Sequence, residues 1–141
     1  MGAMSKYLLD TNVCVCFLRN KFKVDQKVKA IGLENCAISE ITVAELKYGE
    51  EYAKLKDGAK FKDQKLDELF EDITIYPIKD ALDLYAKEKA RLRINGTPQE
   101  DDFDLLIGCT AVVNQLVMVT ENYKDFKNIQ GIDIENWIVR E

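Results

Sequence analysis

Four acidic side chains lie near the ends of short apolar runs that have the character of buried β-strands. The runs are residues 7–9, 36–38 and 117–119, and the acids are Asp10, Glu45, Asp104 and Asp125. Asp10 directly follows the first run, and Asp104 opens the apolar segment that leads into the last one. In open parallel sheets, ligands bind beyond the carboxyl ends of the strands. We therefore expect these carboxylates to meet at one edge of a sheet.

Carboxylates held a few ångströms apart repel one another and raise each other's pKa. A hard divalent cation removes this conflict, because Mg²⁺ prefers oxygen ligands and keeps several of its waters. One or two such ions can activate water and stabilise the leaving oxygen when a phosphodiester is cleaved. Taken singly, each acid has an ordinary explanation as a helix cap, a turn residue or a solvated side chain. The spacing alone leaves both interpretations open.

The sequence contains no histidine. This excludes Ser-His-Asp and Cys-His nucleophilic catalysis, histidine-based cleavage of RNA and zinc sites built on histidine. Acid–base or metal chemistry must then come from carboxylates, Lys, Tyr or Cys. The net charge of −5 argues against a general nucleic-acid coat protein, which would be basic. It does not exclude a nuclease, because bound divalent ions reverse the local field at a carboxylate site.

The length of 141 residues and the 47% hydrophobic content fit one globular domain with a real core. We expect that domain to span residues 4–141, with Met4 as the natural start and residues 1–3 as a cloning remnant. No apolar run approaches the roughly 18–20 residues that span a membrane, and no signal peptide is visible. The four cysteines form no Cys-x-x-Cys pair. We therefore expect reduced core thiols in a cytoplasmic protein.

Strand-like and helix-like segments alternate along the chain. Strands are expected at residues 7–9, 36–38, 73–78, 117–119 and 132–134. Helices are expected at residues 13–18 (opened by Thr11 or Asn12), 24–31, 41–55 (capped by Ser39), 61–70, 81–95 and 105–116 (opened by Asp104). This alternation predicts an α/β domain of three layers with a short, mainly parallel central sheet.

Four separate motifs can be recognised in the chain. They are Leu-Leu-Asp-Thr-Asn at residues 8–12, Ser-Glu-Ile-Thr-Val-Ala-Glu-Leu at 39–46 with Tyr48-Gly49, Gly-Thr-Pro at 96–98 leading to Asp-Leu-Leu-Ile-Gly at 104–108, and Val-Thr-Glu-Asn at 119–122 with Asp125-Phe126. In order and content they resemble the PIN-domain family, and more narrowly the VapC toxins of bacterial toxin–antitoxin pairs. The resemblance runs from Tyr7 to Trp137, nearly the whole chain.

This resemblance implies a PIN fold and an endoribonuclease that depends on Mg²⁺ or Mn²⁺. It assigns metal binding and catalysis to Asp10, Glu45, Asp104 and Asp125. It places Asn12, Ser39, Thr120 and Asn122 where they would support the site or its waters. It also implies a homodimer and a small antitoxin partner of the VapB type.

The loop at residues 99–103 departs from the family pattern, because it is more acidic than usual and one residue longer before the key acid. Asp102 is therefore a candidate to share the role of Asp104, although the Leu-Leu-Ile-Gly that follows favours Asp104. RNA needs positive contacts around an acidic pocket. The candidates are Lys54, Lys56, Lys60, Lys62, Arg91 and Arg93, which are equally well explained as solvated helix faces.

An acidic pocket is a natural target for a partner's Arg or Lys, since a guanidinium can pair with two carboxylate oxygens in place of an ion. The apolar surface for the dimer and the partner helix would come from Val13, Phe17, Leu18, Tyr48, Tyr52 and Leu55, which are equally well explained as core. One alternative is a non-catalytic PIN-type module that binds RNA or protein, but that would be favoured by loss of an acid. Another is an α/β phosphatase or receiver domain, but that pattern expects a second Asp where Asn12 stands.

Overall fold

The computed structural model of the chain describes residues 5–58 and 63–140. The expected cloning remnant at residues 1–3 and the proposed start at Met4 lie outside the described residues. Phe61, expected on a helix, and the candidate RNA contacts Lys60 and Lys62 also lie outside them.

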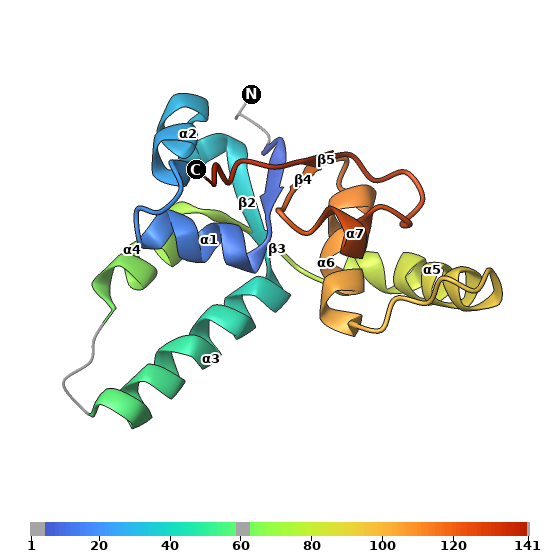
Figure 1. The fold of residues 1–141 in the computed structure, drawn as a ribbon, viewed down its shortest axis with the longest axis horizontal. Helices are drawn as coiled ribbons and strands as arrows, with labels where there is room; N and C mark the ends of the chain where they lie inside the picture. The colour runs from blue at the N-terminus through green and yellow to red at the C-terminus, as the bar shows by residue number, and fades with distance from the viewer. Residues whose placement is uncertain (1–4, 59–62, 141) are drawn as a thin grey trace.

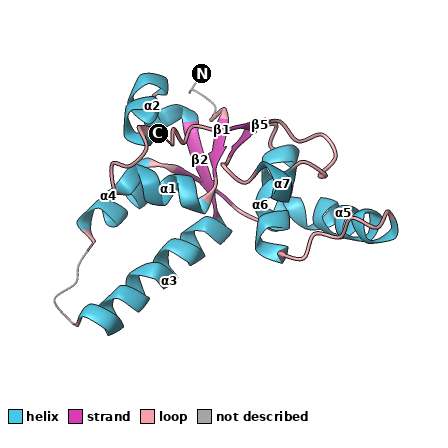
Figure 2. Cartoon of the chain, in the orientation of Figure 1, coloured by secondary structure: helices cyan, strands magenta, loops and turns pink. Residues whose placement is uncertain are grey.

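Five parallel strands form the centre of the fold (Figure 2). They are β1 (Tyr7–Leu9), β2 (Cys36–Ser39), β3 (Thr74–Tyr76), β4 (Val117–Val119) and β5 (Ile134–Glu135). Their order in the sheet is β3-β2-β1-β4-β5, and every pairing is parallel. In the register, Leu8 of β1 lies opposite Ala37 of β2 and Met118 of β4. The expected parallel sheet is confirmed, with β1 at its centre.

Helices cover both faces of this sheet (Figure 1). They are α1 (Thr11–Leu18), α2 (Val24–Ile31), α3 (Glu40–Asp57), α4 (Gln64–Asp72), α5 (Leu82–Ile94), α6 (Asp102–Val113) and α7 (Tyr123–Phe126), with 3₁₀ turns η1 (Leu33–Asn35) and η2 (Lys79–Ala81). In Figure 1, α1, α2 and α4 lie on one side of the strands, and α5, α6 and α7 lie on the other. Helix α3 contacts both α1 and α6, and its C-terminal half extends beyond them.

Alternating side chains of the strands give each face its own core, because successive residues of a strand point to opposite faces. Leu9 and Val119 pack with α1, α2 and α4, in a cluster that includes Val13 and Trp137. The neighbouring strand residues Leu8, Ala37 and Met118 pack instead against α5 and α6, in a cluster that includes Leu92, Leu105 and Phe126. The two clusters on either side of the sheet make the three-layer architecture that the sequence predicts.

Two helices begin earlier than expected, because an aspartate caps each of them. Helix α1 begins at Thr11, and Asp10 accepts the N–H of Thr11 as its N-cap. Helix α6 begins at Asp102 rather than at Asp104, because Asp101 accepts the N–H groups of both Phe103 and Asp104. The prediction that Asp104 opens this helix is therefore wrong. A third difference is α7, a short helix where the sequence suggested only a turn around Asp125.

All four cysteines are buried and free, which confirms that they belong to the core. Burial raises the pKa of Cys36 to about 11 and that of Cys109 to about 12. These thiols therefore stay protonated at neutral pH and are poor nucleophiles. In the described part of the chain, none of the helices combines the length and the apolar composition that crossing a membrane requires.

Close packing between α6 and the segment that carries Asp125 depends on Gly108. A Cβ at this position would lie 2.4 Å from Cδ1 of Ile129 and 3.2 Å from Cδ1 of Phe126, and both side chains are buried. We expect Gly108→Ala to lower the free energy of unfolding by about 1–3 kcal/mol, as overpacking does. Gly49→Ala is the control in helix α3, where a Cβ meets nothing within 4 Å. It should raise stability by about 0.5–1 kcal/mol. Urea unfolding measures both, and equal effects would contradict this packing.

Candidate metal-dependent nuclease site

The carboxyl ends of three adjacent strands gather polar side chains at one edge of the sheet. Asp10 follows β1, Ser39 ends β2 and Thr120 follows β4. The N–H of Asp10 donates to the carbonyl of Val119 at 2.9 Å, which extends the pairing of β1 and β4. The sheet therefore fixes the backbone of Asp10 independently of its side-chain contacts.

The Asp10 carboxylate is held by two neutral donors and is only 5% exposed. Its Oδ1 accepts the N–H of Thr11 at 2.8 Å, and its Oδ2 accepts the hydroxyl of Thr120 at 2.8 Å. Burial raises the pKa of Asp10 from its ordinary value, and the negative charges of Glu45 and Asp125 raise it further. The hydrogen bonds from Thr120 and Thr11 oppose this rise without overcoming it. Asp10 is thus fixed in place but short of positive charge.

Glu45 reaches the same region from α3. The Thr11 hydroxyl donates to Oε1 of Glu45 at 2.6 Å and lies 3.1 Å from the hydroxyl of Thr42, which is fully buried. Thr11 therefore links α1, the helix that Asp10 caps, to the helix that carries Glu45. Neither Thr11 nor Thr42 was among the candidate site residues, although both lie inside the motifs that contain Asp10 and Glu45.

Asp104 lies in the first turn of α6 and is partly buried. Burial and the nearby charge of Asp101 raise its pKa to about 7, with further contributions from Asp10, Asp125 and Glu45. Asp101, not Asp102, is the loop acid that acts on Asp104. The Asp102 carboxylate instead accepts hydrogen bonds from Lys89 at 2.6 Å and from the Tyr85 hydroxyl at 2.8 Å.

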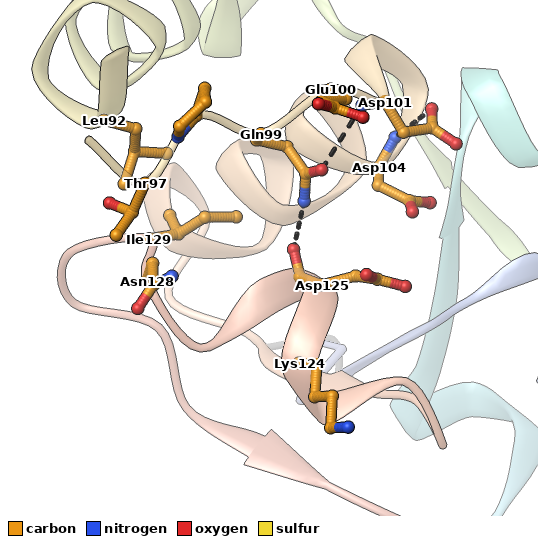
Figure 3. A pocket seen from close by; sticks show the side chains of 11 residues that line it. Leu92, Thr97, Gln99, Glu100, Asp101, Asp104, Lys124, Asp125, Asn128 and Ile129 are labelled. Atoms are coloured by element: carbon orange, nitrogen blue, oxygen red, sulfur yellow. Dashed lines mark hydrogen bonds between the residues drawn. The ribbon is translucent and has the colours of Figure 1, made fainter. Parts of the chain in front are cut away.

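Asp125 lies on α7 and faces a pocket of about 410 Å³ (Figure 3). The pocket is lined by Leu92, Thr97, Pro98, Gln99, Glu100, Asp101, Asp104, Lys124, Asp125, Asn128 and Ile129. In Figure 3 the carboxylates of Asp104 and Asp125 are directed to the same side, and Gln99 lies between the segments that carry them. The volume of this pocket is in the range of pockets that bind small ligands. Gln99 and Lys124 are pocket residues that the sequence alone did not single out.

The remaining candidates have smaller roles in the local geometry. Ser39 is fully buried, and its Oγ accepts the N–H of Ile41 at 3.0 Å, so it caps α3 as expected. Thr120 accepts the N–H of Asn122 at 3.0 Å while donating to Asp10. Asn12 and Asn122 are both exposed.

The donor set fits a hard divalent cation. The charges of Asp10, Glu45 and Asp125 all act on Asp104, so the four acids share one region. Their neighbours are hydroxyls, and oxygen donors are what Mg²⁺ prefers. Within residues 5–58 and 63–140, however, no group of three acidic or cysteine side chains is arranged to hold an ion by itself. Asp10, Glu45, Asp104 and Asp125 are the residues that would hold such an ion, and its own waters would supply the remaining oxygen ligands.

Comparison with known proteins places this geometry in a family. The model of the PIN domain matches residues 7–132. The chain belongs to the PIN-domain family. It is 31% identical to ribonuclease VapC2 of Rickettsia felis and 32% identical to the tRNA(fMet)-specific endonuclease VapC of Salmonella typhimurium. These matches cover 93% and 95% of this chain and 97% and 99% of those proteins. Among solved structures, VapBC2 of Rickettsia felis, bound to a DNA fragment from its promoter, has a TM-score of 0.79 at 29% identity, covering 96% of this chain and 99% of that one.

Within this PIN domain, the raised pKa of Asp104 predicts a pH-dependent stability. Below about pH 4 the carboxyl is protonated in both the folded and the unfolded states, and between about pH 4 and 7 only the folded state keeps the proton. Stability from this group is therefore lost as the pH rises from 4 to 7. In chelator, Asp104→Asn should gain about 1–2 kcal/mol over the wild type between pH 4 and 8, after a discount for solvent screening.

Urea unfolding at a series of pH values measures this difference. The exposed Asp67→Asn on α4 is the matched control and should follow the wild type across the range. A parallel pH profile for Asp104→Asn and the wild type would show that the fold does not raise the pKa of Asp104.

Proposed function

We propose that this protein is an endoribonuclease that depends on Mg²⁺ or Mn²⁺ and is the toxin of a VapBC-type pair. The observation that carries the proposal is the meeting of four carboxylate charges at one edge of the sheet, in a chain without histidine. The relatives named as a ribonuclease and a tRNA-specific endonuclease support RNA as the substrate. All four acids are present, which disfavours the alternative of a non-catalytic PIN module.

In this proposal, Asp10 and Asp104 hold the ion, and Glu45 and Asp125 complete its surroundings. A bound divalent ion would supply an activated water and stabilise the leaving oxygen of the phosphodiester. Thr120 and the N–H of Thr11 keep the Asp10 carboxylate in one orientation. Asp104, with its pKa near 7, would give up its proton on ion binding, so affinity for the ion should rise with pH.

We narrow the candidate positive contacts for RNA by their partners in the fold. Lys54 and Lys56 lie in the last turn of α3, and Lys54 pairs with Glu50 and Glu51. Arg91 is bound to the carboxylate of Glu88.

Lys124 instead lines the same pocket as Asp104 and Asp125. We assign it to the phosphate that follows or precedes the scissile one, because it is the basic side chain among the pocket residues. Arg93 is exposed on α5 and remains a candidate at longer range.

The first test of the proposal is Asp10→Asn. Asparagine is also a good N-cap, so α1 should stay capped and the protein folded. Cleavage should fall by more than about 100-fold, because a neutral amide does not replace a charged ligand. Sequencing of new RNA ends, after incubation with total RNA and Mg²⁺, measures the activity.

Two controls accompany this test. Asp67→Asn should cut at the wild-type rate, and excess chelator should abolish all cleavage, with Ca²⁺ a poor substitute. If Asp10→Asn cleaved RNA at nearly the wild-type rate, the assignment of Asp10 to the catalytic site would be wrong. Undiminished cleavage in chelator would remove the metal mechanism.

A groove beside Glu45 suits the proposed antitoxin. It has a volume of about 300 Å³ between α1, α3 and α4, and its apolar lining includes Val15, Leu18 and Leu46. Acidic residues, including Glu45, lie along the same groove. A partner helix with an apolar face and an Arg could therefore lie in it and present the guanidinium to Glu45. The solved VapBC structure of Rickettsia felis supports a VapB-like partner for this chain.

The expected apolar docking surface separates into three groups of residues. Val13 is fully buried in the core, so its proposed place on a docking surface is wrong. Phe17 and Leu18 are partly buried. Tyr48, Tyr52 and Leu55 are 70%, 56% and 88% exposed on α3. We assign this last group to the homodimer.

The dimer is tested by Leu55→Glu. A charge at the centre of an apolar contact must be desolvated without a partner, so the Kd of the Leu55→Glu dimer should be at least about tenfold higher than that of the wild type. Ile94→Glu on α5 is the matched control, because Ile94 is 84% exposed and the chemical change is the same. Sedimentation over a range of concentrations measures both variants. A monomeric wild type, or a Leu55→Glu variant as dimeric as Ile94→Glu, would place the interface elsewhere.

A further inference from the structure

The Gln99 side chain joins two segments that are separate in sequence. Its Nε2 donates to the backbone carbonyl of Asp125, and its Oε1 accepts the N–H of Asp101 at 3.3 Å (Figure 3). Gln99 is partly buried in the loop between α5 and α6. One end of the amide thus binds α7, and the other end binds the backbone of the loop itself.

Asp101, which Gln99 contacts, in turn binds the backbone of Asp104. The Asp101 Oδ1 accepts the N–H of Phe103 at 2.9 Å and the N–H of Asp104 at 3.2 Å. Gln99 is therefore connected to the backbone of Asp125 on one side and, through one capping residue, to the backbone of Asp104 on the other. We infer that Gln99 is a positioning residue, which sets the spacing of the Asp104 and Asp125 carboxylates for a divalent cation. This inference rests on the proposed function.

The spacing needs such a brace because the two acids repel each other. The charge of Asp125 is among those that act on Asp104. Helix α7 has only four residues, and Asp125 on it is exposed. A helix this short has little stability of its own. The hydrogen bond from Gln99 to the carbonyl of Asp125 holds this residue against its repulsion by Asp104.

The far end of α7 is anchored independently of Gln99. Arg91 donates to the carbonyl of Asn128 at 2.7 Å, and Glu88 accepts the N–H of Gln130 at 2.6 Å. Glu88 is 3% exposed and also binds Arg91 at 2.7 Å and 2.8 Å. Phe126 is fully buried against α6. Loss of the Gln99 contacts should therefore leave α7 attached and the protein folded.

The test is Gln99→Met, which keeps the length and bulk of the side chain but removes both hydrogen bonds. Gln26→Met, at an exposed position of α2, is the matched control. Three measurements are made on each full-length protein: the thermal midpoint, the binding of Mn²⁺ from the EPR signal of the free ion, and the rate of RNA cleavage. Gln99→Ser is measured beside them, because it leaves a small polar group in the loop.

We expect both Gln99 variants to bind Mn²⁺ about 10-fold more weakly, and to cut RNA about 10–100-fold more slowly at saturating metal. Their thermal midpoints should stay within about 3 °C of the control. Wild-type Mn²⁺ affinity and cleavage in folded Gln99 variants would overturn the positioning role and leave the proposed function standing. A loss of activity that follows only a loss of folding would also overturn it. If the wild type neither binds Mn²⁺ nor cuts RNA, the proposed function and this role fall together.

Discussion

The burial of Asp10 and Asp104 beside other acids is the constraint on which the rest of the site depends. Burial is the largest cause of the raised pKa of both carboxyls, and that of Asp104 reaches about 7. The negative charges of Glu45 and Asp125 raise the pKa of both further. The fold supplies the opposing force through apolar packing away from the site. Each acid has a deeply buried apolar side chain one residue away along the chain: Leu9 before Asp10, Leu46 after Glu45, Leu105 after Asp104 and Phe126 after Asp125.

The hydrogen bonds to the carboxylates of Asp10 and Glu45 come from neutral donors, so they do not cancel the negative charge of the site. Thr120, Thr11 and backbone N–H groups are the donors to Asp10 and Glu45, and each of them is neutral. Several ion pairs of the described residues join other partners: Lys54 with Glu50 and Glu51, Lys89 with Asp102, Arg91 with Glu88, and Arg140 with Glu121. A lysine inside the acidic cluster would relieve the strain, but it would also occupy the place of an ion. Orientation by hydroxyls fixes the carboxylates and preserves their affinity for a cation.

Features that depend on local sequence could be predicted, and features that depend on contacts between distant segments could not. The ends of β1 and β4, the Ser39 cap and the edge where Asp10 lies follow from local patterns, and they agree with the structure. The strands expected at residues 73–78 and 132–134 are instead Thr74–Tyr76 and Ile134–Glu135. The start of α6 did not follow, because three aspartates at residues 101, 102 and 104 are all suitable caps. Contacts in the folded chain separate their roles: Asp101 accepts the N–H groups of Phe103 and Asp104, and Asp102 pairs with Lys89 from another helix.

The residues that orient the acids were missed for the same physical reason. Thr11 reaches Glu45 across 34 positions, and Gln99 reaches Asp125 across 26. Such contacts depend on how α1 meets α3 and how the loop meets α7, which no local pattern encodes. With this geometry, the site could bind either a metal ion or a guanidinium group of a partner. A metal ion and a guanidinium can each satisfy a carboxylate cluster that is oriented by neutral donors. The groove between α1, α3 and α4 has one of these acids, Glu45, in its lining. Because one negative charge cannot be fully neutralised twice, a partner that enters there would oppose metal binding by charge as well as by bulk.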